Sequence, residues 1–154
     1  MKTIIRNFGF ILCIFLISFS IQAQEKIDLM LIVETDSITQ DNISETCRFE
    51  DQSPDTSIID YITKVSIDDE IKWKVREADN NDAKVKLVKF KHDNGTKFFG
   101  QDSIPEKNGR IKGKIVEGNE NEEEKYSLII QVKNSNNDWQ EYTIDPKLKL
   151  TQRE

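Results

Sequence analysis

The residues of this sequence best suited to bind a ligand or do chemistry are carboxylates and amides. They occur together in short polar segments. Asp79, Asn80, Asn81 and Asp82 offer four oxygen-bearing side chains in a row. Calcium binds several oxygen ligands that converge from one loop, but the spacing here matches no EF-hand. Clustered carboxylates in a turn are usually solvated. We therefore expect no metal ion, with calcium as an open alternative, and assign these four residues to a ligand-binding surface.

Trp139 is a second candidate for ligand contact, with Tyr142 nearby. It follows Asp138 at the start of an alternating apolar pattern, where its ring can be exposed. An exposed ring can contact a protein or carbohydrate ligand, whereas an aromatic residue that opens a strand more commonly packs in the core. An unknown protein or carbohydrate is the partner that this pattern suggests.

Cys47 is the cysteine that remains if the N-terminal segment containing Cys13 is removed. Its neighbour Arg48 would lower the pKa of the thiol and make it reactive. The alternative is a small buried hydrophobic residue beside Phe49, the environment in which free cysteines are usually found. In either case no intramolecular disulfide can form.

A single histidine, His92, narrows the possible metal and catalytic chemistry. A copper site of the cupredoxin type needs two imidazoles and a thiolate, and structural zinc needs four nitrogen or sulfur ligands. The sequence has no Gly-x-Ser-x-Gly elbow and no phosphate-binding glycine loop. We expect His92 in solvent at the mouth of a hairpin, and predict neither catalysis nor a cofactor.

Residues 1–23 have the layout of a cleaved signal peptide. Lys2 and Arg6 precede an apolar run over 8–21, and small residues follow at a cleavage site after Ala23. This run is too short to span a bilayer, so we expect a secreted or periplasmic protein with no membrane insertion after cleavage. Residues 24–154 are then a single domain with 20 basic and 28 acidic residues. That charge disfavours nucleic acid as a partner.

Alternating apolar residues predict strands throughout this domain. Ile71, Trp73 and Val75 alternate with basic residues, and similar patterns cover 126–132 and 142–144. Residues 26–34 are apolar on both faces and predict a central strand. The phase slips near Leu87, which indicates a β-bulge. Asn-Gly pairs at 94–95 and 108–109 predict hairpins.

These patterns predict an all-β fold, an antiparallel two-sheet β-sandwich of the immunoglobulin-like or cupredoxin-like kind with roughly eight strands. Two segments fit it less well. Residues 35–56 read as a long polar loop, and 57–67 read as a strand with Ile59, Tyr61, Val65 and Ile67 facing inward.

Three segments resemble the PixA/AidA inclusion-body protein family. "IDLMLIVETDSI" at 27–38 is similar to that family's opening strand, and "SIDDEIKWKVREADNND" at 66–82 to a Gly-Asp-x-Val-x-Trp strand with paired asparagines after it. "WQEYTIDPKLKL" at 139–150 is similar to the closing strand. Asp68 stands where the family has glycine, and the loop after the first strand differs. The resemblance implies a β-sandwich without an established enzyme activity.

Three hypotheses for function follow. The first is a non-catalytic exported binding or interaction module, with 35–56 and the turns at 78–82 and 134–138 as its variable surfaces. The alternative is a self-assembling, inclusion-body-like protein, for which a homo-oligomer is expected. The least favoured is a secreted hydrolase with paired carboxylates, because the sequence cannot place two of them across a cleft.

Overall fold

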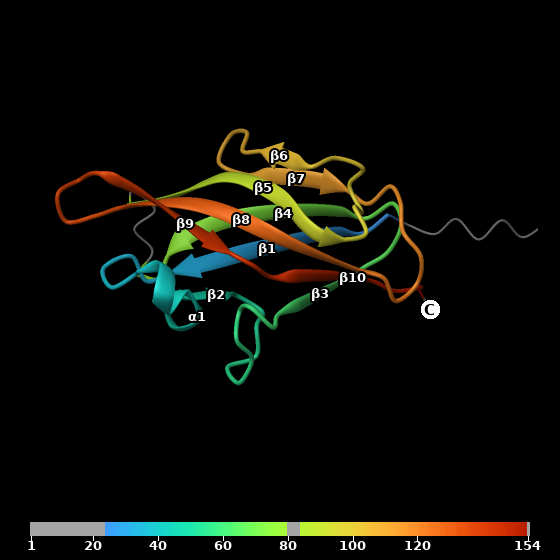
Figure 1. Ribbon diagram of the computed structural model, residues 1–154, viewed down its shortest axis with the longest axis horizontal. Helices are drawn as coiled ribbons and strands as arrows, with labels where there is room; N and C mark the ends of the chain where they lie inside the picture. The colour runs from blue at the N-terminus through green and yellow to red at the C-terminus, as the bar shows by residue number, and fades with distance from the viewer. Residues whose placement is uncertain (1–23, 80–83, 154) are drawn as a thin grey trace, which may run out of the picture.

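Two β-sheets make up the protein in the computed structural model, which describes residues 24–79 and 84–153 (Figure 1). The first sheet has the order β2 (Cys47–Phe49), β1 (Lys26–Val33), β4 (Glu70–Glu77), β7 (Ile111–Lys114). The second has the order β3 (Ile62–Val65), β10 (Lys147–Leu150), β8 (Glu123–Lys133), β5 (Val85–Gly95), β6 (Ser103–Pro105). A further strand, β9 (Trp139–Ile144), pairs with β8.

Both sheets are mixed, which corrects the expectation of an antiparallel arrangement. β1 pairs with β4 in parallel, from Lys26 beside Glu70 to Val33 beside Glu77. β3 pairs with β10 in parallel, whereas the other pairs are antiparallel. The described residues contain ten strands rather than roughly eight, because several are only three or four residues long.

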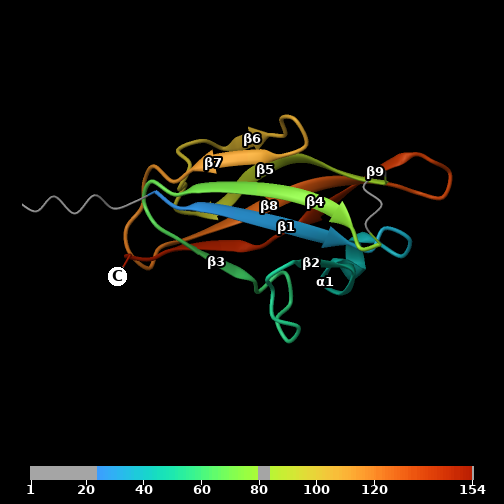
Figure 2. The same ribbon diagram turned by 180° about the vertical axis from the view of Figure 1, so that it is seen from behind.

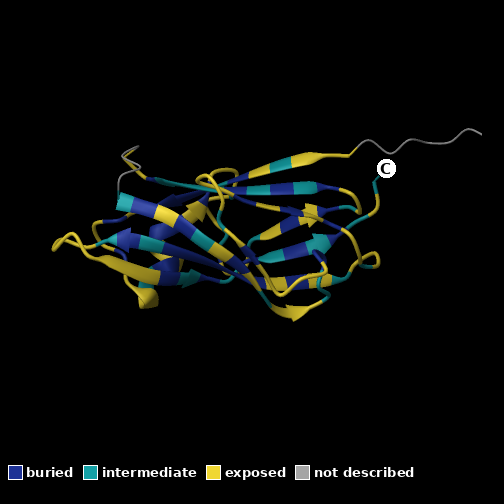
Figure 3. Cartoon of the chain, turned by 90° about the horizontal axis from the view of Figure 1, so that it is seen from above, coloured by how far each residue is buried: buried dark blue, intermediate teal, exposed yellow. Residues whose placement is uncertain are grey.

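The inner faces of the two sheets share one hydrophobic core, as the alternation predicted. Exposed and buried residues form alternating bands along the strands (Figure 3). Trp73 on β4 is fully buried and contacts the rings of Phe90, Phe99 and Tyr126 at centroid distances of 5.2, 5.6 and 5.7 Å. Its Nε1 donates a hydrogen bond of 3.1 Å to the Tyr126 hydroxyl on β8, which joins the two sheets.

The two Asn-Gly pairs that predicted hairpins have different conformational roles in the structure. Asn108 and Gly109 both have positive φ, 57° and 76°, as a type I′ turn requires, but this turn connects β6 and β7 of different sheets. The Asn-Gly pair at 94–95 instead ends β5, with a register shift between His92 and Asn94. The other shift, between Leu87 and Lys89, confirms the predicted bulge.

The two segments that fitted poorly are more structured than the sequence suggested. Residues 35–56 contain η1 (Gln40–Asn42), α1 (Ile43–Thr46) and β2, so the expectation of one long polar loop was wrong. Only 62–65 of the segment 57–67 form a strand, and Ile59 and Ile67 are exposed rather than inward. No helix among the described residues is long and apolar enough to cross a membrane.

The Trp73–Tyr126 hydrogen bond leads to the first prediction. Tyr126→Phe leaves the buried indole N–H without its acceptor, which should lower the free energy of unfolding by about 1 to 3 kcal/mol. Tyr61→Phe is the control, because the Tyr61 hydroxyl bonds Asp51 at an exposed position and should contribute less. Urea denaturation measures both. An equal loss in the two variants would contradict a special role for the bridge between the sheets.

Candidate functional site

The parallel pairing of β1 and β4 brings two polar chain segments together at one end of the protein. The two arrowheads end side by side near α1 and the β8–β9 hairpin (Figure 2). Residues 34–36 follow β1 and residues 77–79 complete and follow β4, which places Glu34 and Asp36 close to Glu77 and Asp79. We define the end site as residues 34–37, 77–79 and 84 together with 133–135 and 140 of the hairpin.

Glu77 is the buried carboxylate of the end site, with 4% of its side chain exposed. Its Oε1 accepts a short hydrogen bond from the Thr35 hydroxyl and lies 3.4 Å from Lys84 Nζ. Lys84 also lies 2.9 Å from Asp36 Oδ1, and these two carboxylates raise the pKa of its ammonium group, Asp36 most strongly. The second Glu77 oxygen, Oε2, has no hydrogen-bond partner among the residues that the structure describes.

Two cavities lie at the end site, and Glu77 lines the smaller one. The larger, about 270 Å³, lies between 35–38 and the β8–β9 hairpin, with Ile38, Val132 and Tyr142 as its apolar lining and Asp36, Lys84, Lys133, Asn134, Ser135 and Gln140 as polar lining. The smaller, about 230 Å³, is lined by residues 34–37 and 77–79. Carboxylate, ammonium, amide and hydroxyl groups therefore converge there, a combination that can bind a polar, hydroxyl-rich ligand.

The structure separates the two parts of the ligand surface predicted from sequence. Asp79 is exposed and lines the smaller cavity, while Asn80, Asn81 and Asp82 lie outside the described residues. Trp139 is 40% exposed, but its ring lies under Lys86 and Lys133, 4.1 and 5.3 Å from their ammonium nitrogens. Gln140 and Tyr142 line the larger cavity, so Trp139 lies on the opposite face of β9.

Cys47 opens β2 instead of lying in a polar loop, and it is 2% exposed. Burial raises the pKa of its thiol to about 12. Arg48 points to the other face of the strand and is exposed. This environment fits the buried alternative that the sequence left open, and thiol reactivity stays a prediction.

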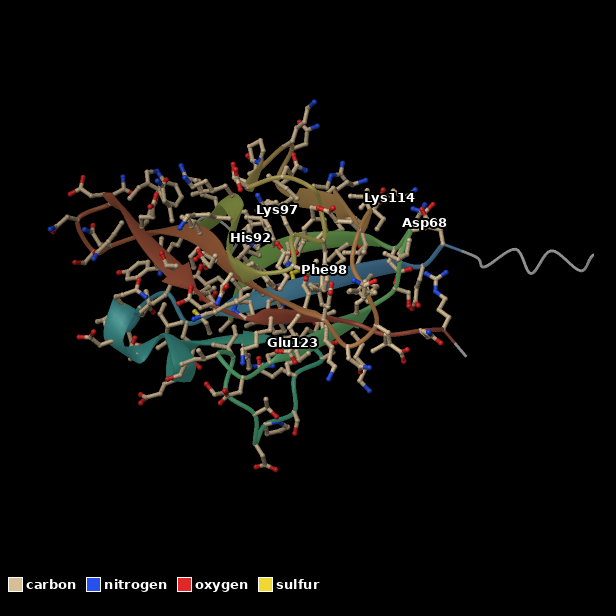
Figure 4. All side chains as sticks on the ribbon, turned by 45° about the vertical axis from the view of Figure 1, so that its right-hand side comes forward. Asp68, His92, Lys97, Phe98, Lys114 and Glu123 are labelled. Atoms are coloured by element: carbon tan, nitrogen blue, oxygen red, sulfur yellow. The ribbon has the colours of Figure 1, made fainter. Side chains whose placement is uncertain are left out.

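His92 is also less exposed than expected. Its Nδ1 lies 2.8 Å from Oε1 of Glu124 on the neighbouring strand β8, and Glu124 is fully buried. The other Glu124 oxygen accepts a hydrogen bond of 2.9 Å from the Phe98 backbone N–H. His92, Lys97 and Phe98 lie close together in Figure 4. Burial raises the pKa of Glu124, and the hydrogen bond with His92 opposes that rise.

Sequence reasoning missed the residues with the most unusual environments. Glu77 and Glu124 occur among many solvated carboxylates, and nothing local distinguishes a buried one. The sequence did indicate burial through the position of each glutamate in the alternation along its strand. Glu77 continues the inward series Ile71, Trp73 and Val75, and Glu124 has the parity of Tyr126 and Leu128. Among the described residues, no three His, Cys, Asp or Glu side chains converge as metal ligands would.

Comparison with known proteins shows a similarity in fold to a solved structure. No protein-family model and no curated protein matches the sequence. A crystal structure of an inclusion body protein, PixA, from Burkholderia cenocepacia J2315 superposes with a TM-score of 0.58 at 9% sequence identity. The alignment covers 86% of this chain and 98% of that one. The likeness confirms, for the fold, the resemblance seen in the sequence.

One local feature agrees with that likeness. Asp68, which stands where the family has glycine, has a φ of 74°, a conformation that glycine adopts most easily. Its carboxylate lies 2.8 Å from Lys114 Nζ, and the two residues are adjacent in Figure 4. Asp68 therefore adopts a backbone conformation that glycine, the residue of the similar family motif at this position, adopts most easily.

The Thr35–Glu77 hydrogen bond gives a prediction for the end site. Thr35→Val removes the donor to a buried carboxylate and should lower the free energy of unfolding by about 2 kcal/mol. In a Glu77→Gln background the acceptor is neutral, so the same change should cost about 1 kcal/mol. Ser37→Ala, at an exposed neighbouring position, is the control. Urea denaturation of wild type, the two single variants and the double variant measures the coupling between Thr35 and Glu77. Additive losses in the free energy of unfolding would contradict this coupling.

A second prediction concerns pH. Because the native pKa of Glu124 lies above its usual value of 4.5, the native state binds more protons than the unfolded state between these two values. The contribution of Glu124 to the free energy of unfolding therefore falls as the pH rises from 4.5 to the native pKa of Glu124. Glu124→Gln should remove the slope, whereas Glu123→Gln, at the exposed neighbour, should keep it. Chemical denaturation from pH 4 to 8 tests this, and parallel curves for wild type and Glu124→Gln would contradict it.

Proposed function

We propose that this chain is an exported, non-catalytic β-sandwich protein that works by assembling with copies of itself. The observation that carries this proposal is a concentration of exposed apolar side chains in one short segment, residues 59–67. The solved structure with the same fold is titled an inclusion body protein, which favours assembly over hydrolysis or ligand capture. An immunoglobulin-like or cupredoxin-like classification, and export through cleavage after Ala23, belong to this proposal.

The segment 59–67, which we name the apolar edge segment, surrounds the edge strand β3. Ile59, Ile62 and Ile67 are 46%, 41% and 40% exposed. Only two other large hydrophobic residues in the described part of the chain are as exposed, Val116 and Trp139, and they lie in other segments. Exposed apolar side chains along a sheet edge are typical of a site for association between chains.

A second candidate function is polar ligand binding at the end site. The observation that favours it is the buried Glu77 Oε2 atom, which has no hydrogen-bond partner among the described residues, while Glu77 lines the smaller cavity. A ligand hydroxyl in the cavity of about 230 Å³ that Glu77 lines could satisfy it, and this cavity has room for a small polar group such as one sugar unit. A protein or carbohydrate partner therefore stays part of the proposal.

Assembly can be tested by the dependence of mass on concentration. The full chain is expressed with its own N-terminal segment, and mass spectrometry of the purified product shows whether it begins at Gln24. Light scattering should give a mass that rises above the monomer with concentration. The double variant Ile59→Lys, Ile67→Lys should lower this mass, because it places charge in the apolar edge segment.

Val116→Lys is the matched control, since this residue is 55% exposed and lies outside the segment. It should leave the mass unchanged. A wild-type protein that stays monomeric at every concentration would contradict the proposed function.

A further inference from the structure

The free edges of the two sheets differ in how well they are closed to another strand. On β2, both backbone groups of Phe49 are bonded to Gln52: Phe49 N–H to its Oε1 at 3.0 Å and Phe49 C=O to its N–H at 3.1 Å. On β9, the Gln40 side chain pairs with Thr143, Nε2 to the carbonyl at 2.9 Å and Oε1 to the N–H at 3.0 Å. These amides occupy the place of a neighbouring strand.

The edges of β6 and β7 are protected in other ways. β6 is three residues long and ends at Pro105, which has no N–H to offer. β7 carries Lys112 and Lys114, and lysines on an edge discourage pairing with another strand.

β3 is the edge that remains open. The carbonyls of Tyr61 and Val65 accept hydrogen bonds from the β10 side, from Lys147 N–H at 3.1 Å and Thr151 N–H at 2.8 Å. Backbone groups alternate along a strand, so those of Ile62 and Lys64 point away from β10. The side chains of Ile62 and Lys64 are exposed, while those of Thr63 and Val65 are buried.

We propose that β3 pairs antiparallel with β3 of a second copy around a two-fold axis at Thr63, so that the second sheet continues across the dimer. This inference rests on the proposed function and specifies its contact. Ile62 of each copy then faces Lys64 of the other, and the outward groups of both residues form four hydrogen bonds within β3.

The two neighbouring registers should be less stable than the register centred on Thr63. Centring the axis on Lys64 places two ammonium groups opposite each other. Centring it on Ile62 leaves only two hydrogen bonds within β3, because the next pair would need the Asp60 N–H, which already bonds Ser57 at 3.0 Å. In the Thr63 register, the exposed Asp60 lies diagonally opposite Lys64 of the second copy, and Ile59 opposite its Ile67.

Thr63 lies on the proposed two-fold axis. Its side chain is buried beside the Tyr61 hydroxyl, which bonds Asp51 at 2.8 Å. Burial raises the pKa of this hydroxyl, and a side-chain hydrogen bond with Thr63 opposes that rise. Threonines that face each other across antiparallel strands can hydrogen-bond, and the two-fold axis provides that arrangement for Thr63.

Cysteine cross-linking distinguishes the registers. Ile62→Cys, Thr63→Cys and Lys64→Cys are made in the full chain and oxidised at a concentration at which wild type assembles. Residues that face each other at a non-hydrogen-bonded position have Cα atoms about 4.5 Å apart, within disulfide reach, whereas diagonal positions exceed about 7 Å. Thr63→Cys should give the most covalent dimer on a non-reducing gel, at least fivefold more than the other two.

Wild type is the control for the native Cys47, which is buried and should not cross-link. Ile62→Lys, at an exposed position that does not affect folding of the core, should raise the dissociation constant of the dimer at least tenfold. Preferential cross-linking of Ile62→Cys or Lys64→Cys, or an unchanged dissociation constant in Ile62→Lys, would overturn the register while leaving assembly intact. A monomeric wild type would overturn the proposed function itself.

Discussion

The parallel pairing of β1 with β4 is the constraint on which the arrangement of this protein depends. Parallel neighbours cannot be joined by a tight turn, so the chain must travel from one end of the sheet back to the other between Val33 and Glu70. The residues 34–69 that make this return include α1, β2 and β3, and they supply the edge strands of both sheets on that side. The same pairing puts the carboxyl ends of β1 and β4 next to each other, which assembles the end site.

Buried carboxylates occur at three positions in the described part of this fold. Glu77 is held by Thr35 and Lys84 across the parallel pair, Glu124 by His92 and the Phe98 N–H, and Asp69 by Arg153 and the Ser66 N–H. A buried carboxylate is tolerated only when donors compensate its lost hydration. In each case at least one donor comes from a different strand or loop, so these carboxylates hold the connections in place as well as the sheets.

The sequence was sufficient for features that depend on local periodicity. The inward position of Trp73, the central place of 26–33 and the bulge at Leu87 all follow from which side of a strand each residue occupies. The sequence was insufficient for features that depend on residues far apart in the chain. The alternation within β1 and β4 is the same whether they run parallel or antiparallel, so direction could not be inferred. The Asn-Gly pair at 94–95 has hairpin composition, yet β5 continues through it because β8 pairs with it to its end.

The candidate site shows the same limit more strongly. The sequence indicated the polar segments that gather at the end of the sheets, and Asp79 lies there, but the buried Glu77 two residues earlier was passed over. Burial of Glu77 depends on Thr35, 42 residues away, and no local pattern contains that contact. Trp139 was chosen for its type and place in a turn, whereas its position on the outer face of β9 depends on the pairing of that strand with β8.

Edge protection agrees with the proposed assembly, because it limits where the strands of a second copy can pair. Among the described strands, four of the five free edges are closed by glutamine side chains, proline or lysines. Because only the β3 edge is open in the described part of the chain, association is confined to a single geometry. A two-fold pairing of β3 leaves neither copy with an open edge. Lys64 in the middle of β3 contributes to the same restriction, because it penalises registers that bring two lysines together. An edge made of isoleucines alone would pair in several registers, whereas this one favours the register in which charge faces an apolar side chain.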